Sequence, residues 1–114
     1  MKTIYAIDYA ENDEKFCVVE IPVIKEDEFD GETYYYVDYD NLDDIQRRAI
    51  YWNRALAKYG EGIYNWTTDK EQFEDIKRHF ASKIIKQIQR QIIVANERLN
   101  KTLESAYLIG ALED

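Results

Sequence analysis

The feature that most constrains the fold is a long helical pattern, itself free of glycine and proline, in the second half of the chain. From Asp69 to Ile109, apolar residues recur at steps of three or four, close to the 3.6-residue turn of an α-helix. A continuous helix of this length would extend for about 60 Å at 1.5 Å per residue. A compact domain of 114 residues has a radius of gyration of only about 13 Å. We therefore expect the helix either to break, near Asn96–Asn100, or to project and find a partner.

A helix-entry signal precedes this pattern. Thr68-Asp69-Lys70-Glu71 fits a capping box, in which Thr68 caps the helix and Glu71 reaches back to the backbone. The sequence thus predicts a long helix over residues 68–109. We assign self-association, as a possible homodimer, to apolar positions along it: Ile84, Ile88, Ile92, Leu99 and Leu103.

The first forty residues have the alternating pattern of β-strands instead. Strands are predicted over residues 3–9, 15–24 and 32–39, which are rich in Ile, Val and Tyr. The links between them are short enough for hairpins, so an antiparallel meander is expected over residues 1–40.

A first helix is predicted over residues 41–60. Asn41 would cap it, Gly60 would close it, and one apolar stripe would run along it: Ile45, Ala49, Trp52, Leu56 and Tyr59. The expected fold is therefore a single α+β domain over residues 1–114, with three strands followed by two helices.

Charge is distributed unevenly along the chain. Residues 1–44 hold fourteen acids and three lysines, whereas residues 45–114 hold twelve basic and nine acidic residues. A meander would gather many of the acids at the edge of the sheet where the first helix begins. These are Asp8, Glu11, Asp13, Glu14, Asp38, Asp40, Asp43 and Asp44.

Three roles for this acidic edge remain open. The acids can be a solvated hairpin tip beside a helix N-terminus, where negative charge is favoured. They can form a surface that fits a basic groove on a nucleic-acid-binding protein. They can also hold a divalent cation, although abundant carboxylates without fixed spacing are weak support for a metal site.

Tyrosine is unusually frequent, with ten in the chain, and Tyr34-Tyr35-Tyr36 places rings on both faces of one strand. Helices on both faces would cover these rings, or Tyr34 and Tyr36 would contribute to a binding surface. Lys83, Lys86 and Arg90 lie opposite the apolar stripe of the long helix. They form a basic ridge that is either solvated and ion-paired or in contact with nucleic acid.

Several classes of protein find no support. There is no apolar leader and no membrane-length apolar stretch, and the one cysteine cannot form an internal disulfide, so we expect a cytoplasmic protein. Catalytic triads, phosphate-binding loops and zinc spacings are absent from the sequence. The loop that begins at Glu26 has Val37 where an EF-hand requires glutamate. We therefore expect no enzyme activity, cofactor or metal.

The segment Trp66-Thr67-Thr68-Asp69-Lys70-Glu71-Gln72-Phe73, after a tyrosine-rich strand, resembles small proteins of unknown function encoded by phages and prophages of Gram-positive bacteria. The resemblance covers about half of the chain and carries no binding residues with it. It implies a mobile-element context, in which small acidic proteins often inhibit host CRISPR or restriction effectors.

The sequence thus leads to two hypotheses. The first is a phage-encoded inhibitor, in the manner of an anti-CRISPR DNA mimic, whose acidic edge and tyrosines block a basic host protein without contacting nucleic acid or membrane. The second is a structural or adaptor protein that assembles through its long helix.

Overall fold

The structure, a computed structural model, describes residues 1–110. The chain divides into two compact units, Met1–Ala81 and Ser82–Asp114. The first contains an antiparallel sheet and the start of a long helix, and the second contains the rest of that helix. The α+β class expected from the sequence is confirmed.

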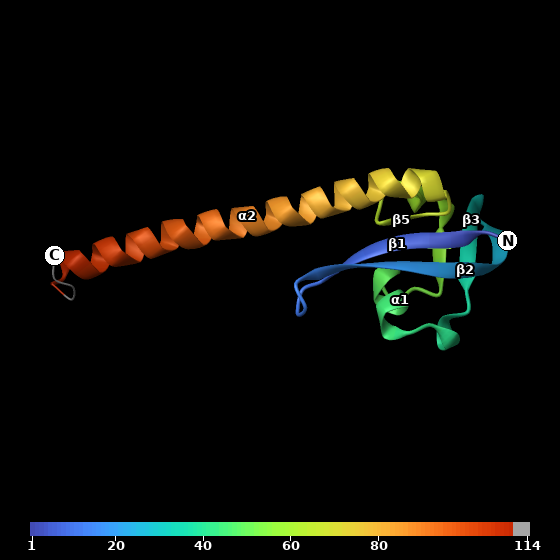
Figure 1. The fold of residues 1–114 in the computed structure, drawn as a ribbon, viewed down its shortest axis with the longest axis horizontal. Coiled ribbons are helices and arrows are strands. Elements are labelled where there is room, and N and C mark those ends of the chain that lie inside the picture. The colour runs from blue at the N-terminus through green and yellow to red at the C-terminus, as the bar shows by residue number, and fades with distance from the viewer. Residues whose placement is uncertain (111–114) are drawn as a thin grey trace. The chain divides into compact units, whose positions relative to one another are not determined.

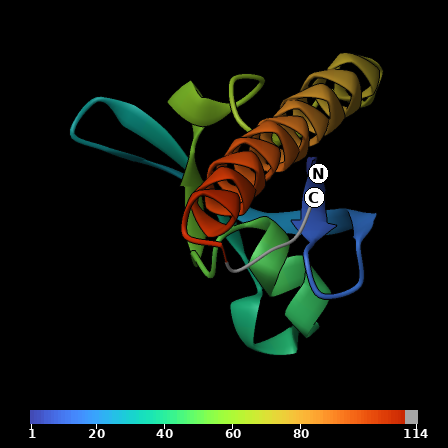
Figure 2. The same ribbon diagram turned by 90° about the vertical axis from the view of Figure 1, so that its left-hand side faces the viewer.

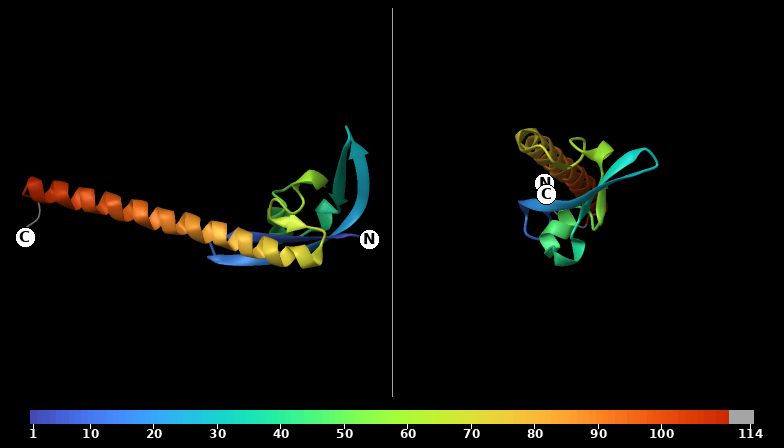
Figure 3. Two further views of the ribbon diagram at one scale, coloured as in Figure 1. Left: turned by 90° about the horizontal axis from the view of Figure 1, so that it is seen from above. Right: turned by 90° about the vertical axis from the view of Figure 1, so that its right-hand side faces the viewer.

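The predicted meander is present as β1 (Thr3–Ala10), β2 (Lys15–Phe29) and β3 (Glu32–Val37), as Figure 1 shows. The long strand β2 pairs with β1 over its first half, from Lys15 to Pro22, and with β3 over its second half, from Val23 to Phe29. A register shift between Val23 and Lys25 separates the two halves. Such an irregularity bends a strand, and Figure 3 shows the β2–β3 hairpin curving away from β1.

The helix predicted over residues 41–60 is wrong. That segment contains a short 3-10 turn, Tyr39–Asn41, then α1 (Asp44–Ala49), then β4 (Ala55–Ala57) and a second 3-10 turn, Lys58–Gly60. Asp43, not Asn41, caps α1: its carboxylate accepts from the Gln46 N–H at 2.7 Å, and the Gln46 side chain accepts from the Asp43 N–H at 2.9 Å.

The chain leaves α1 through two left-handed residues, Tyr51 with φ 55° and Trp52 with φ 61°. A right-handed helix cannot continue through this backbone conformation. The apparent stripe that joined Ile45 to Tyr59 therefore combines residues of a helix, a turn, a strand and a second turn.

Two short strands complete the sheet, and the sequence pattern did not predict them. β4 pairs with β3, and β5 (Trp66–Thr67) pairs with β1, which gives the strand order β4-β3-β2-β1-β5. Strands of three and two residues are too short to show alternation, so only their partners define them.

The long helix is continuous, as α2 (Lys70–Leu108), and the break near Asn96–Asn100 does not occur. The predicted cap is displaced by one residue. Asp69 Oδ1 accepts from the N–H groups of Glu71 and Gln72, at 3.0 and 3.4 Å. The Thr68 hydroxyl donates to Glu61 instead, so the capping box with Glu71 is not formed.

Strand β1 of the first unit is covered on both faces. Ala49 and Ile50, at the end of α1, pack against Ile4, Ile21 and Tyr35. The other face of β1 packs against the beginning of α2, with Ile7 against Phe73 and Ile76. Figure 2 shows α1 (green) below the strands β1 and β2 (blue). The alternating pattern of β1 therefore serves two apolar layers, not one core face and one solvent face.

Candidate functional site

The acids expected at one edge of the sheet do not lie together there. Glu11, Asp13 and Glu14 occupy the β1–β2 hairpin, next to the pair Ala10–Lys15. The end of β3 lies elsewhere, because Val37 pairs with Val23. Eight positions of β2 separate Val23 from Lys15, about 26 Å at 3.3 Å per residue. A meander in which every strand spans the whole sheet would bring these groups together, but β1 and β3 pair with different halves of β2.

The remaining five acids all have partners within the chain. Asp8 bonds Arg48 at 2.5 Å and has a side chain only 13% exposed, so this pair ties β1 to α1. The others satisfy groups around α1: Asp38 accepts from Asn41, Asp40 pairs with Arg54, Asp43 caps α1, and Asp44 pairs with Arg47. These five acids therefore make contacts within the fold itself.

The three consecutive tyrosines of β3 have different surroundings. Tyr35 is fully buried and packs edge-on against Trp66, with ring centroids 5.9 Å apart. Tyr34 and Tyr36, on the opposite side of the strand, are both half-buried. Lys25 lies 5.4 Å from the centroid of the Tyr36 ring, whereas Tyr34 lines a pocket.

The five positions assigned to self-association all lie on α2. Ile92 and Leu99 are more than half exposed, Ile88 and Leu103 are exposed to a smaller extent, and Ile84 is half-buried. With Ala95 and Ala106 they form what we call the apolar row. Apolar residues on one side of a helix ordinarily face a core or a partner. Within the described part of the chain, the members of this row past Ile84 are all exposed except Ala106, which is half-buried.

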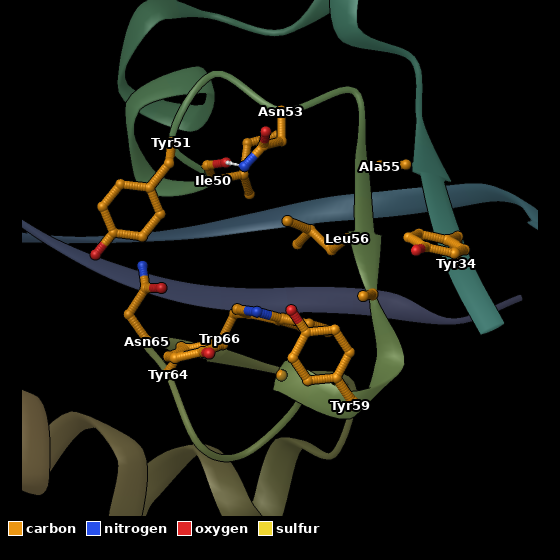
Figure 4. A pocket seen from close by; sticks show the side chains of 12 residues that line it. Tyr34, Ile50, Tyr51, Asn53, Ala55, Leu56, Tyr59, Tyr64, Asn65 and Trp66 are labelled. Atoms are coloured by element: carbon orange, nitrogen blue, oxygen red, sulfur yellow. Dashed lines mark hydrogen bonds between the residues drawn. The ribbon is translucent and has the colours of Figure 1, made fainter. Parts of the chain in front are cut away.

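The first unit contains a pocket of about 560 Å³. Figure 4 shows its lining of aromatic rings around Leu56, contributed by β3, β4, β5 and the turns that join them. The rings are those of Tyr34, Tyr51, Tyr59, Tyr64 and Trp66. The other lining residues are Ile50, Asn53, Ala55, Ala57, Gly60 and Asn65, so the wall contains no charged side chain.

Asn65 is the polar residue buried in the pocket wall, at 3% exposure. Its amide nitrogen donates to the Ile7 carbonyl at 2.8 Å and to the Ala49 carbonyl at 2.7 Å. Rotating the amide by half a turn would set its oxygen against two other oxygens, so these contacts fix its orientation. Asn65 Oδ1 then accepts no hydrogen bond from any residue that the structure describes.

Tyr51 closes one side of the pocket. Burial raises the pKa of its phenol, and the negative charge of Asp8 raises it further. The hydroxyl therefore remains neutral at physiological pH and can act as a hydrogen-bond donor or acceptor. Its left-handed backbone, rare for an aromatic residue, is the type of local strain that clusters at binding sites.

The sequence did not indicate this pocket. Aromatic residues are dense between Tyr51 and Trp66, but three of the residues there were assigned to a helical stripe. Two glycines within three residues, Gly60 and Gly62, argue against a helix beyond that point and in favour of turns. Gly60 has a specific role, because a Cβ there would lie 2.7 Å from the ring of Tyr64.

Over residues 1–110 no three His, Cys, Asp or Glu side chains are grouped as metal ligands would be. In the same range no helix combines the length and the apolar character that a membrane crossing requires. Comparison of the chain with protein-family models, with curated proteins and with solved structures gave no match. Functional proposals for this chain therefore rest on its own residues.

Proposed function

We propose that this chain is a non-enzymatic interaction module that assembles with a second copy of itself through the apolar row of α2. The observation that carries the proposal is the exposure of this row along a helix that leaves it uncovered. We therefore prefer the adaptor hypothesis to the inhibitor hypothesis. The inhibitor hypothesis requires one continuous acidic edge, whereas the sheet register separates the acids of the β1–β2 hairpin from those that follow β3.

The spacing of the row suits a long helical contact. From Ile84 the row advances by steps of four, four and three residues to Ala95. The same three steps lead from Ala95 to Ala106, so the row repeats every eleven residues. An eleven-residue repeat averages 3.67 residues per turn, so the row stays nearly parallel to the axis of an α-helix. Two such rows can remain in contact over their whole length.

The charges of α2 avoid the row. At 100° per residue, all seven charged residues between Lys83 and Glu104 lie about 90° or more from the centre of the row. They are Lys83, Lys86, Arg90, Glu97, Arg98, Lys101 and Glu104. An uncharged face offers nothing to an acidic or basic partner, but it is compatible with an identical copy of itself. A two-fold interface places the same surface on both chains.

Helix energetics favour the same arrangement. Isolated helices are marginally stable in water, and packing of an apolar face supplies most of their stability in proteins. Every side chain from Ile85 to Ser105 is exposed, so this stretch gains no such packing within the chain. Pairing with a second copy would supply it.

A matched pair of substitutions tests this assignment. Ile92→Glu places a charge in the row, whereas Val94→Glu places the same charge about 130° away from the row centre. The parent residues are equally exposed, at 54% and 53%, so the two changes differ mainly in which side of the helix they alter. Light scattering should give a multimeric mass for the native chain and for Val94→Glu, and a single-chain mass for Ile92→Glu. A native chain that scatters as a monomer would exclude self-assembly.

A phage-encoded inhibitor of a basic nucleic-acid-binding protein is the second candidate. The observation that favours it is the β1–β2 hairpin, where Glu11, Asp13 and Glu14 are exposed. Lys substitution of both Glu11 and Asp13 should abolish any relief of CRISPR or restriction activity that the native chain gives in a bacterial host. If the native chain gives no relief, or the double variant relieves equally well, the hairpin is not an inhibitory surface.

A further inference from the structure

The aromatic pocket of the first unit points to a second activity that is independent of assembly. We propose that it binds a flat, neutral aromatic ring that carries an N–H group, such as an indole or a nucleobase, and that Asn65 Oδ1 accepts the hydrogen bond from that group.

The lining favours a neutral aromatic ligand. Ligand pockets in proteins have volumes of about 300–1,000 Å³ and mainly apolar or aromatic walls with a few polar groups, and this pocket of about 560 Å³ has both features. Rings of Tyr34, Tyr59 and Trp66 offer edges and faces for offset or edge-on stacking. A charged ligand would lose its hydration without gaining a counter-charge, because no lining side chain is ionised.

The buried amide determines the polar requirement. Asn65 is buried, with 3% exposure, and both of its N–H donors already make hydrogen bonds within the chain. Only its oxygen is unsatisfied, so the complementary ligand group is a donor. In Figure 4 this oxygen lies on the side of the amide towards Leu56.

Tyr51 is the side chain that admits such a ligand. Figure 4 shows its hydroxyl end directed towards the Asn65 amide. Asn65 Oδ1 has almost no accessible surface, so a lining group must move before a ligand can reach it. Tyr51 is 60% exposed and extends from a left-handed turn, which leaves its ring free to rotate outwards.

Two probes of nearly identical shape test the donor requirement. Indole carries a ring N–H, whereas benzofuran has an oxygen in the same place and can donate nothing. In titrations of the full chain followed by amide and side-chain NMR shifts, indole should shift the Asn65 side-chain signals and bind at least about tenfold more tightly than benzofuran. Equal affinities would overturn the role of Asn65. Absence of shifts at the lining residues with both probes would overturn the pocket as a binding site.

Two further probes define the ligand. Tetramethylammonium tests the pocket as a cation cage, and its binding in preference to indole would contradict the proposal. N-acetyltryptophanamide carries the same indole on a peptide-like backbone. If it binds as indole does, the ring comes from a tryptophan side chain of a partner protein; if indole alone binds, the ring comes from a free small molecule.

Glycine substitutions at two adjacent positions separate binding from folding. Tyr51→Gly removes a lining ring at a positive φ, a conformation that glycine adopts without strain. Trp52→Gly makes the same backbone change at an aromatic residue that does not line the pocket. We expect both variants to stay folded, with indole binding tighter in the first, because no ring then has to move aside, and unchanged in the second. Equal binding by all three proteins would overturn Tyr51 as the group that admits the ligand.

Discussion

At the scale of single residues, Glu61 connects the sheet to the start of α2. Its carboxylate accepts from the Tyr35 hydroxyl at 3.2 Å and from the Thr68 N–H at 2.8 Å, and the Thr68 hydroxyl also donates to it. Burial acts to raise the pKa of Glu61, but the hydrogen bonds from Thr68 and Tyr35 outweigh it and lower the pKa below the usual 4.5. The charged form is therefore the one that the fold stabilises.

Glu61→Gln should lower the free energy of unfolding by about 1.5–3 kcal/mol, the usual contribution of hydrogen bonds to a charged group. Because the folded-state pKa is depressed, the stabilisation by Glu61 is present above about pH 4.5 and is lost as the pH falls through the folded-state value. Urea titrations at neutral and acidic pH should show a difference between native and variant that narrows with acid. Glu11→Gln, at an exposed hairpin position, serves as the control and should change little.

Residue roles of this kind could not be predicted from the sequence. Asp8 was expected to belong to an acidic edge, but it pairs with Arg48, forty positions away. No local sequence pattern singled out Asn65, whose hydrogen bonds go to carbonyls of β1 and α1. Local patterns carry no information about which distant residue will complete a contact.

At the scale of elements, the prediction was correct where the pattern extends over many residues. The alternation of β1 and the long helical periodicity of α2 both correspond to the observed elements. It was wrong for residues 41–60, where five apolar residues matched a helical spacing by coincidence. The left-handed turn at Tyr51 and Trp52 ends the helix, and Leu56 then pairs with Tyr35 in the sheet.

Two substitutions of Trp52 measure the strain of this turn. Both Trp52→Gly and Trp52→Ala remove the same ring, but only alanine retains a Cβ at φ 61°. The left-handed conformation costs about 1–2 kcal/mol for a residue with a Cβ. The glycine variant should therefore be more stable than the alanine variant by roughly 1 kcal/mol in thermal unfolding. In a helix the order would be reversed, so an alanine variant of higher stability would contradict the turn.

The start of α2 provides a second test at this scale. Asp69→Ala removes the side chain that accepts from the N–H groups of Glu71 and Gln72, and should cost about 1 kcal/mol. Glu71→Ala would cost a similar amount if the Thr68 capping box existed. In the observed arrangement it removes only an exposed acid of the first turn, and chemical denaturation should show a smaller loss than for Asp69→Ala.

At the scale of the whole molecule, assembly should couple to helix content. The stretch from Ile85 to Ser105 has no packing within the described part of its own chain. If a second copy covers the apolar row, that copy supplies the packing, and dilution removes it by separating the two chains. The helical signal in circular dichroism should therefore decrease on dilution, and the melting temperature should rise with protein concentration. In Ile92→Glu both quantities should be independent of concentration, whereas Val94→Glu should behave as the native chain does.

Net charge also enters at this scale. The chain carries −8 at pH 7, which opposes the approach of two copies, while the row itself contains no charge. Added salt screens this repulsion and does not weaken apolar burial. Assembly through the row should thus be unchanged or strengthened by salt, in contrast to binding of a basic partner by the acidic hairpin, which salt would weaken.

Sedimentation equilibrium of the native chain over a wide range of concentration, at low and high salt, tests self-assembly most directly. The apolar row predicts a mass that rises from one chain towards an integral multiple of it, with an association constant that salt leaves unchanged or increases. A mass of one chain at every concentration and both salt conditions would contradict self-assembly through α2.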